Sequence, residues 1–255
     1  MRLAMLIGVC ACSAGLAADP PYAGKWKMND ARSDFGDITV TYEQLPGGQI
    51  KATMDGQSYQ FKMDGTEVMT PWGTGMTWKT AGAGSWQTTE TTNGKVTSTG
   101  TVKLSGDGKM LAVDSRQIKA DGGTSEFTLT LNRVSGGPGL PGKWKTKNLK
   151  NSSPEAMSVA PKGSDGLTLS FGNQGGVCDA RFDGKDYPAT GSLWPPGWTC
   201  SIARNGSHGF DLSWKKDGKP MYQTTLHVSG DGKVLTETGS AAGVNERVKI
   251  VYDRQ

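Results

Sequence analysis

Hydrophobic and polar residues alternate with period two along most of the chain, and helical periodicity is nearly absent. The run Ile38-Thr39-Val40-Thr41-Tyr42 alternates in this way, and so does Leu167-Thr168-Leu169-Ser170-Phe171. Such alternation predicts β-strands with one buried face. Ten Asp-Gly or Asn-Gly pairs stand between the alternating runs. These dipeptides accept a positive φ and favour tight hairpin turns, so the pattern predicts antiparallel meanders.

The same pattern occurs twice. Gly24-Lys25-Trp26-Lys27 recurs as Gly142-Lys143-Trp144-Lys145, and the Ser-Gly-Asp-Gly-Lys sequence at 105–109 recurs at 229–233. Self-similarity at one long period indicates a duplicated domain. We therefore expect one repeat over residues 19–134, a Gly/Pro-rich linker over 135–141 and a second repeat over 142–255.

Each repeat is predicted to hold eight to ten short strands. In the first repeat we expect a short strand around Trp26 and nine more at 38–44, 49–54, 57–63, 66–70, 75–80, 84–91, 95–104, 109–118 and 123–133. A single sheet of that many strands curls strongly, and closure into a barrel removes its edges. The sequence thus predicts an all-β protein with two tandem up-and-down antiparallel β-barrels, and a β-sandwich is the alternative. A helical turn is expected only at 30–35 and at its counterpart, 153–157.

The N-terminal residues 1–18 have the pattern of a secretory signal peptide. A short positive start is followed by an apolar run and by small residues around Ala17. The apolar run of about ten residues is too short to span a bilayer, and no later segment is apolar enough for a transmembrane helix. We expect a secreted or periplasmic protein, with lipoprotein anchoring through the first cysteines as the alternative.

Each repeat opens with Gly-x-Trp and closes with an arginine. These residues are Trp26 and Arg133 in the first repeat, and Trp144 and Arg254 in the second. The first and last strands of an up-and-down barrel are neighbours, so each arginine is expected to lie over the tryptophan ring of its own repeat and close the barrel. This arrangement resembles the signature of the lipocalin (calycin) family.

A longer stretch, residues 182–191, together with the segment at 24–29, is similar to secreted lipocalin-like proteins of environmental bacteria. The resemblance implies a small barrel that can have an apolar interior. It carries no catalytic motif, and it implies only structural roles for the four closure residues.

Two cysteines, Cys178 and Cys200, follow the expected signal segment. A pair of cysteines in an exported protein usually forms a disulfide. A strand near 185–190 is expected between them, which would place the outer strands about 9.5 Å apart, more than a disulfide can span. We predict that the middle strand stops short and that the bond staples the rim of the barrel.

The composition makes some functions improbable. The net charge of +4 comes from scattered lysines without a basic stripe, which argues against nucleic-acid binding. Both histidines, His208 and His227, lie in the second repeat and are expected at the surface. The sequence therefore offers no catalytic triad or histidine metal site common to both repeats.

Carboxylates are the other candidate chemistry. Asp179 and Asp183 could form an acid/base pair, but Asp183 belongs to an Asp-Gly turn. Asp30, Asp34 and Asp37 lack the dense oxygen spacing of a calcium loop. We predict no catalytic residue, no cofactor and no metal site. An exported isomerase or hydrolase is kept only as a minor alternative.

Four tryptophans on Gly/Pro-rich loops are the candidate ligand-binding residues. Trp72 and Trp78 in the first repeat correspond to Trp194 and Trp198 in the second. Such side chains can cover the mouth of an apolar cavity, or they can plug a narrow barrel. We expect a non-enzymatic binding protein for a small apolar or amphipathic ligand. The alternative is a cell-envelope interaction or scaffold module with filled barrels and no ligand.

Overall fold

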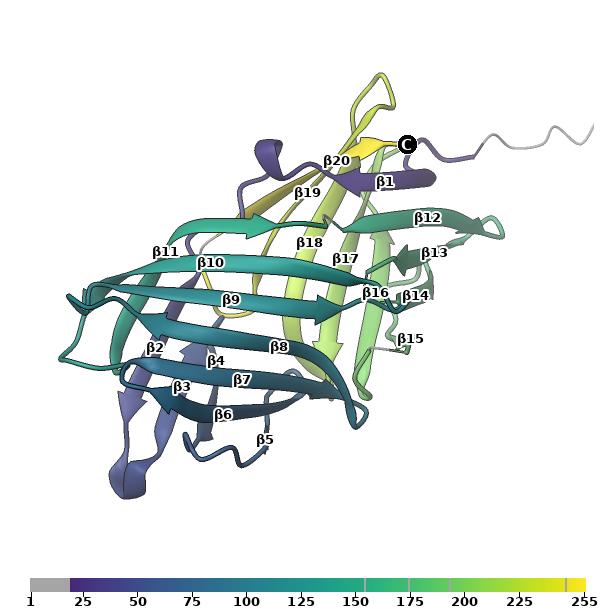
Figure 1. The fold of residues 1–255 in the computed structure, drawn as a ribbon. Helices are drawn as coiled ribbons and strands as arrows, with labels where there is room; N and C mark the ends of the chain where they lie inside the picture. The colour runs from purple at the N-terminus through teal and green to yellow at the C-terminus, as the bar shows by residue number, and fades with distance from the viewer. Residues whose placement is uncertain (1–18, 154, 174, 193, 246) are drawn as a thin grey trace, which may run out of the picture.

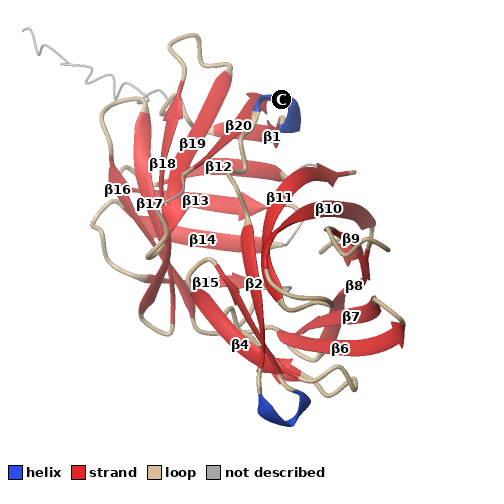
Figure 2. Ribbon diagram, turned by 90° about the vertical axis from the view of Figure 1, so that its left-hand side faces the viewer, coloured by secondary structure: helices blue, strands red, loops and turns tan. Residues whose placement is uncertain are grey.

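The computed structural model describes residues 19–153, 155–173, 175–192, 194–245 and 247–255 and shows an all-β protein of twenty strands (Figures 1 and 2). The first ten strands are β1 (Gly24–Met28), β2 (Thr39–Gln44), β3 (Ile50–Met54), β4 (Gln57–Phe61), β5 (Val68–Met69), β6 (Gly75–Gly82), β7 (Ser85–Thr92), β8 (Lys95–Leu104), β9 (Met110–Ile118) and β10 (Thr124–Ser135). The second ten are β11 (Gly142–Asn151), β12 (Ala156–Lys162), β13 (Gly166–Phe171), β14 (Gly176–Arg181), β15 (Tyr187–Gly191), β16 (Trp198–Arg204), β17 (Gly209–Lys216), β18 (Lys219–Val228), β19 (Val234–Ala241) and β20 (Val248–Arg254).

The strands form two antiparallel sheets of ten, which confirms the predicted fold class. The second barrel consists of β1 and β12–β20 and is fully closed. The first barrel consists of β2–β11 and is nearly closed, with β4 and β5 at its edges. The chain after β4 narrows this gap, because the amide of Gly65 donates to Trp78 O (2.8 Å) and the amide of Thr80 donates to Met63 O (3.0 Å).

The two barrels exchange their first strands. Strand β1 lies between β12 and β20 of the second barrel, and β11 lies between β10 and β2 of the first. Figure 1 shows purple β1 among the green and yellow strands of the other repeat. The boundaries 19–134 and 142–255 thus describe the sequence repeats, whereas each sheet takes its Gly-x-Trp strand from the other repeat.

The exchange corrects the expected partners of the closure residues. Trp26 pairs with Arg254, whose guanidinium lies 4.2 Å from the centroid of its ring. Trp144 pairs with Arg133 at 4.1 Å. The predicted stacking of arginine on tryptophan is therefore present in both barrels, but the pairing of Trp26 with Arg133 and of Trp144 with Arg254 was wrong.

The short linker is the physical reason for the exchange. Strand β10 ends at Ser135 and β11 begins at Gly142, so the chain turns back directly and β11 pairs with β10 as a hairpin. Consecutive strands joined by a short connection usually pair in this way. Arg133 holds the turn by donating to the carbonyls of Gly137 (2.7 Å), Gly139 (2.6 Å) and Pro141 (2.9 Å). Since β11 occupies this place in the first barrel, β1 closes the second.

The segment after β1 carries the chain from the second barrel to the first. It begins with a 3₁₀ turn, η1 (Asp30–Arg32), where a helical turn was expected. Asp34 and Lys249 then exchange two backbone hydrogen bonds of 2.7 Å, and Arg32 forms an ion pair of 2.9 Å with Asp253. These contacts attach the crossing segment to β20. A second helical turn was expected at 153–157. Residues 156 and 157 belong to strand β12 instead.

The glycine of each Gly-x-Trp motif makes room for the arginine. Gly24 has a φ of +143°, and a Cβ atom there would lie 2.5 Å from Nη1 of Arg254. Gly142 has a φ of +146°, and its Cβ would lie 2.8 Å from Nη1 of Arg133 and 2.5 Å from the carbonyl oxygen of Ser135. Both the backbone conformation and the space therefore require glycine.

We expect Gly24→Ala and Gly142→Ala each to lower the free energy of unfolding by about 1–3 kcal/mol, because alanine strains the backbone and displaces the guanidinium. Chemical denaturation measures this loss. Gly106→Ala is the matched control, since its φ is ordinary and no atom lies within 4 Å of the added Cβ. Equal stability of all three variants would contradict the role assigned to these glycines.

The predicted disulfide joins Cys178 in β14 to Cys200 in β16, with a Cα–Cα distance of 6.0 Å. The strand between them is short: β15 pairs with β14 at three positions and with β16 at two. The predicted order of the strands is thus kept, and β14 and β16 converge at the bond. Both cysteines are fully buried in the core of the second barrel, so the bond belongs to the core and not to an exposed rim.

The expected signal segment, residues 1–18, lies outside the described residues. Within the part of the chain that is described, no helix is long and apolar enough to cross a membrane.

Candidate functional site

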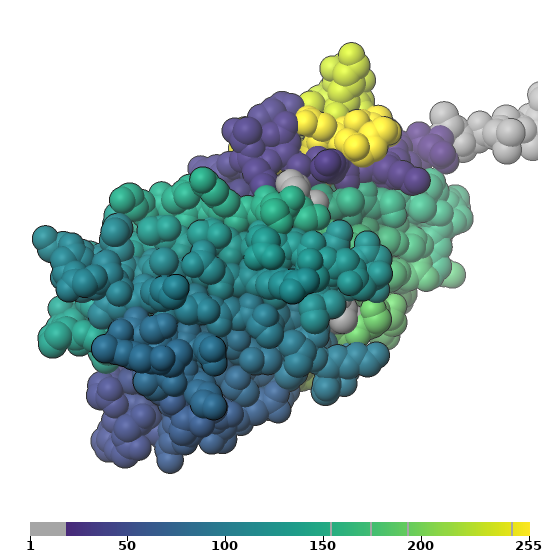
Figure 3. All heavy atoms as spheres, viewed as in Figure 1, coloured from purple at the N-terminus to yellow at the C-terminus, as the bar shows by residue number. Residues whose placement is uncertain are grey.

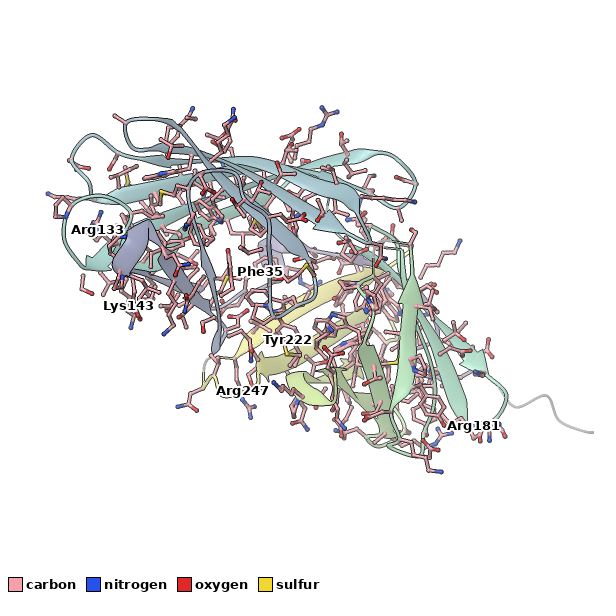
Figure 4. All side chains as sticks on the ribbon, turned by 90° about the horizontal axis from the view of Figure 1, so that it is seen from below. Phe35, Arg133, Lys143, Arg181, Tyr222 and Arg247 are labelled. Atoms are coloured by element: carbon pink, nitrogen blue, oxygen red, sulfur yellow. A yellow bond between two sulfur atoms is a disulfide. The ribbon has the colours of Figure 1, made fainter. Side chains whose placement is uncertain are left out.

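The mouths of the two barrels open onto one cavity of about 590 Å³, which we call the shared chamber. Its described lining comes from both barrels and from the loops between their strands. Figure 3 shows the two repeats packed against each other, and Figure 4 shows Tyr222 between them, with Arg133 at the far end of the first barrel. The described lining of the chamber includes Trp72, Glu90, Ser98, Lys119, Glu155, Phe171, Asn173, Trp194, Trp198, Trp214 and Tyr222.

The second barrel supplies an aromatic wall. Trp194 is its centre, with ring centroids 6.1 Å from Phe171, 5.2 Å from Trp214 and 6.0 Å from Trp198. The ring of Trp198 stacks on Tyr222 at 6.3 Å. These rings come from β13, β16, β17, β18 and the loop before β16, so the whole wall depends on the closure of the second barrel.

Trp72 connects the two repeats at this wall. Its loop lies between β5 and β6 of the first barrel, yet its side chain packs against the core of the second. The indole of Trp72 donates to the hydroxyl of Tyr222 (3.2 Å), and the indole of Trp198 donates to the carbonyl of Trp72 (2.8 Å). The structure thus brings together three of the four expected tryptophans, Trp72, Trp194 and Trp198.

The structure places Trp78 in the core of the first barrel instead. Its side chain is 4% exposed, its ring stacks on Phe61 at 4.7 Å, and it does not line the chamber. The cause is its position along the strand. Trp198 is the first residue of β16, whereas Trp78 is the fourth residue of β6 and so lies deeper in its barrel.

The first barrel supplies a more polar wall. Alternate residues of β7, among them Trp86, Glu90 and Thr92, face the barrel interior, and Glu90 and Thr92 reach the chamber at the mouth. Burial raises the pKa of the Glu90 carboxyl, and a hydrogen bond with Thr74 partly offsets this effect. Further polar side chains of this wall include Thr97, Ser98, Gln117 and Ser125.

Glu90 is the residue that the sequence reasoning missed. The signal was present, because Glu90 lies four residues after Trp86 in one alternating strand and therefore shares its face with that large apolar side chain. A carboxylate on the buried face of an alternating strand needs a partner or a solvated cavity.

Glu155, Lys119 and Asn173 lie at the edge of the chamber. A carboxylate oxygen of Glu155 accepts hydrogen bonds from the backbone amides of Asn173 (2.8 Å) and Ala156 (3.0 Å). Burial raises the pKa of Glu155, and the amide hydrogen bonds oppose the increase. Lys119 lies 3.8 Å from Asp121. The backbone amide of Ala120 donates to the carbonyl of Asn173 (2.9 Å), which joins the two repeats at this edge.

The other charged candidates lie away from the chamber. Asp179 contacts Lys162 (2.5 Å) and Thr168 (2.9 Å) on the outside of the second barrel, and the hydrogen bond from Lys162 lowers the pKa of Asp179. Asp183 accepts the amide of Lys185 in its turn (3.0 Å). Asp37 forms an ion pair with Lys145 (2.5 Å).

The histidines lie on the outer surface. His227 is exposed, as its alternation with Leu226 and Val228 predicted, and its ring lies 6.2 Å from that of His208. Among the described residues, no group of three or more His, Cys, Asp or Glu side chains could hold a metal ion.

No family model matches the chain, and the comparisons with curated proteins and with solved structures gave no match either.

Proposed function

We propose that the protein is an exported, non-enzymatic, lipocalin-like binding protein that holds a small amphipathic molecule in the shared chamber. One observation carries the proposal: both barrels open onto a single cavity of about 590 Å³ with an aromatic wall on one side and a polar wall on the other. Pockets for small molecules typically have volumes of about 300–1,000 Å³ and combine apolar walls with a few polar groups.

The chemistry of the two walls supports an amphipathic ligand. The rings of Trp194, Trp214 and Phe171 offer apolar surface to the body of a ligand, and the side chains of Glu90, Ser98 and Gln117 offer hydrogen bonds to its polar end. Export is supported by the pattern of residues 1–18 and by the buried disulfide, since disulfides persist mainly in oxidising compartments.

A scaffold module without a ligand is the second candidate. Side chains fill the closed ends of both barrels, where Trp26, Tyr22 and Phe210 are fully buried in one and Trp144, Phe61 and Leu131 in the other. The two candidates differ in the role of the chamber. A binding protein requires an open chamber for its ligand, whereas a scaffold does not.

Filling the chamber tests the proposal. We expect Ser98→Trp to weaken the binding of any chamber ligand at least about tenfold, because the indole would occupy the cavity. Thr99→Trp is the matched control, since Thr99 is the next residue of β8 and is exposed on the outside. Titration calorimetry of the wild type and both variants uses a panel of alkyl and aryl amines, acids and alcohols and short oligosaccharides.

Binding that survives in Thr99→Trp and is lost in Ser98→Trp supports the proposal. Equal binding by the two variants would place the ligand elsewhere. If no member of the panel binds the wild type, the scaffold candidate is favoured. Denaturation of both variants checks that the bulky side chain leaves the fold intact.

A further inference from the structure

We infer that the ligand of the shared chamber carries a cationic amine head that pairs with the Glu90 carboxylate, while its apolar body lies against the aromatic wall. The inference rests on the proposed function and adds the chemical class of the ligand. It follows from the charges that line the chamber and from the contacts that each of them makes.

Glu90 is the chamber carboxylate that lacks a partner of opposite charge. None of the ion pairs among the described residues includes Glu90, and the effect that opposes the rise in its pKa comes from the side chain of Thr74. Its neighbours across the sheet are Met76 on β6 and Ser98 on β8, neither of which carries a charge. A carboxylate that is removed from water without a cation is costly, and a ligand cation would offset that cost.

The other two charges of the described lining already have local partners. Glu155 accepts two backbone hydrogen bonds, and the ammonium of Lys119 lies 3.8 Å from Asp121. Lys119 also lies close enough to Glu155 to lower the pKa of that carboxyl. The described lining therefore holds two carboxylates and one ammonium, a net charge of −1 that favours a cation over an anion.

The aromatic wall agrees with this assignment. Four indole rings and one phenol ring line the chamber, from Trp72, Trp194, Trp198, Trp214 and Tyr222. The faces of such rings attract cations and repel anions. A carboxylate head would be repelled by Glu90 at one wall and by these ring faces at the other, whereas neither wall repels an ammonium head at Glu90. Burial raises the pKa of Glu90, and a cation beside the carboxylate would lower it again.

A matched series of small ligands tests the charge of the head. 4-Phenylbutylamine, 4-phenylbutyrate and 4-phenylbutanol share one aromatic body and carry a positive, a negative and a neutral head at pH 7. We expect titration calorimetry to show that the amine binds the wild-type protein at least about tenfold more tightly than the acid. In Glu90→Gln, which keeps the shape of the side chain without its charge, this preference should fall to within about twofold.

Glu126→Gln is the control variant, because Glu126 is exposed on β10 and does not line the chamber; it should keep the preference for the amine. Equal binding of the three ligands by the wild type would overturn the inference and leave the proposed function standing. So would an amine preference that persists in Glu90→Gln. If none of the three binds, and the wider panel does not bind either, both the inference and the proposed function fall.

Discussion

Trp26→Ala is expected to destabilise the second barrel by about 3–5 kcal/mol. The first barrel should keep its stability, although most of its strands come from the same repeat as Trp26. The side chain of Trp26 is fully buried among the strands of the second barrel. Its indole donates to the carbonyl of Tyr22 (3.0 Å), and the ring of Tyr22 lies 5.2 Å from that of Phe210 in β17. Removing the indole therefore opens a cavity at the closed end of the second barrel.

Hydrogen exchange read strand by strand measures this effect. Amide protection should fall in β12 and β20, the neighbours of β1, and remain in β2 and β10. Trp144→Ala is the mirror control and should lower protection in β2 and β10 instead.

A double-mutant cycle then identifies which arginine interacts with Trp26. Trp26 and Arg254 should couple by about 1 kcal/mol, and Trp26 and Arg133 should not couple. Coupling of Trp26 with Arg133 and not with Arg254 would show that the Gly-x-Trp strand of each repeat closes the barrel of its own repeat.

Loss of the disulfide is expected to lower the free energy of unfolding of the second barrel by about 3 kcal/mol, since Cys178 and Cys200 are 22 residues apart in the chain. The effect should concentrate in β15, which holds its neighbours by only five backbone pairings. Trp198 lies two residues before Cys200, so the aromatic wall of the chamber should become less protected as well.

Denaturation of the wild type with and without reductant measures the contribution of the bond. The variant with both Cys178→Ala and Cys200→Ala is the control and should show no response to reductant. A wild type that is equally stable when oxidised and reduced would mean that the barrel wall holds β14 and β16 together without the bond.

Most of the strands could be predicted from the sequence because alternation and turn chemistry agree along the chain. Asp55, Asn93 and Asp217 adopt positive φ in Asp-Gly or Asn-Gly turns, as those dipeptides predicted. The exchange of β1 and β11 could not be predicted from the motif. Both strands carry the same Gly-Lys-Trp-Lys sequence, so either fits beside either arginine. What decides between them is the length of the connection after β10.

The candidate site was predicted in part for a similar reason. Trp72, Trp194 and Trp198 were expected at the barrel mouths and do line the chamber. Trp78 was grouped with them because it follows a Gly/Pro-rich segment as Trp198 does, and its depth within β6 became visible only with the register of the strand. A chamber common to both barrels was not foreseen, because the sequence does not show how the two mouths face each other.

The strand exchange also makes each barrel depend on the other repeat. Strands β2 to β11 of the first barrel are consecutive, and the second barrel takes only β1 from outside the run β12 to β20. The end of β20 lies against β1, since the amide of Gln255 donates to the carbonyl of Lys25 (2.9 Å). Each barrel is thus completed by the Gly-Lys-Trp-Lys strand of the other repeat, β11 in the first barrel and β1 in the second. Neither repeat alone contains all ten strands of the barrel that it mainly builds.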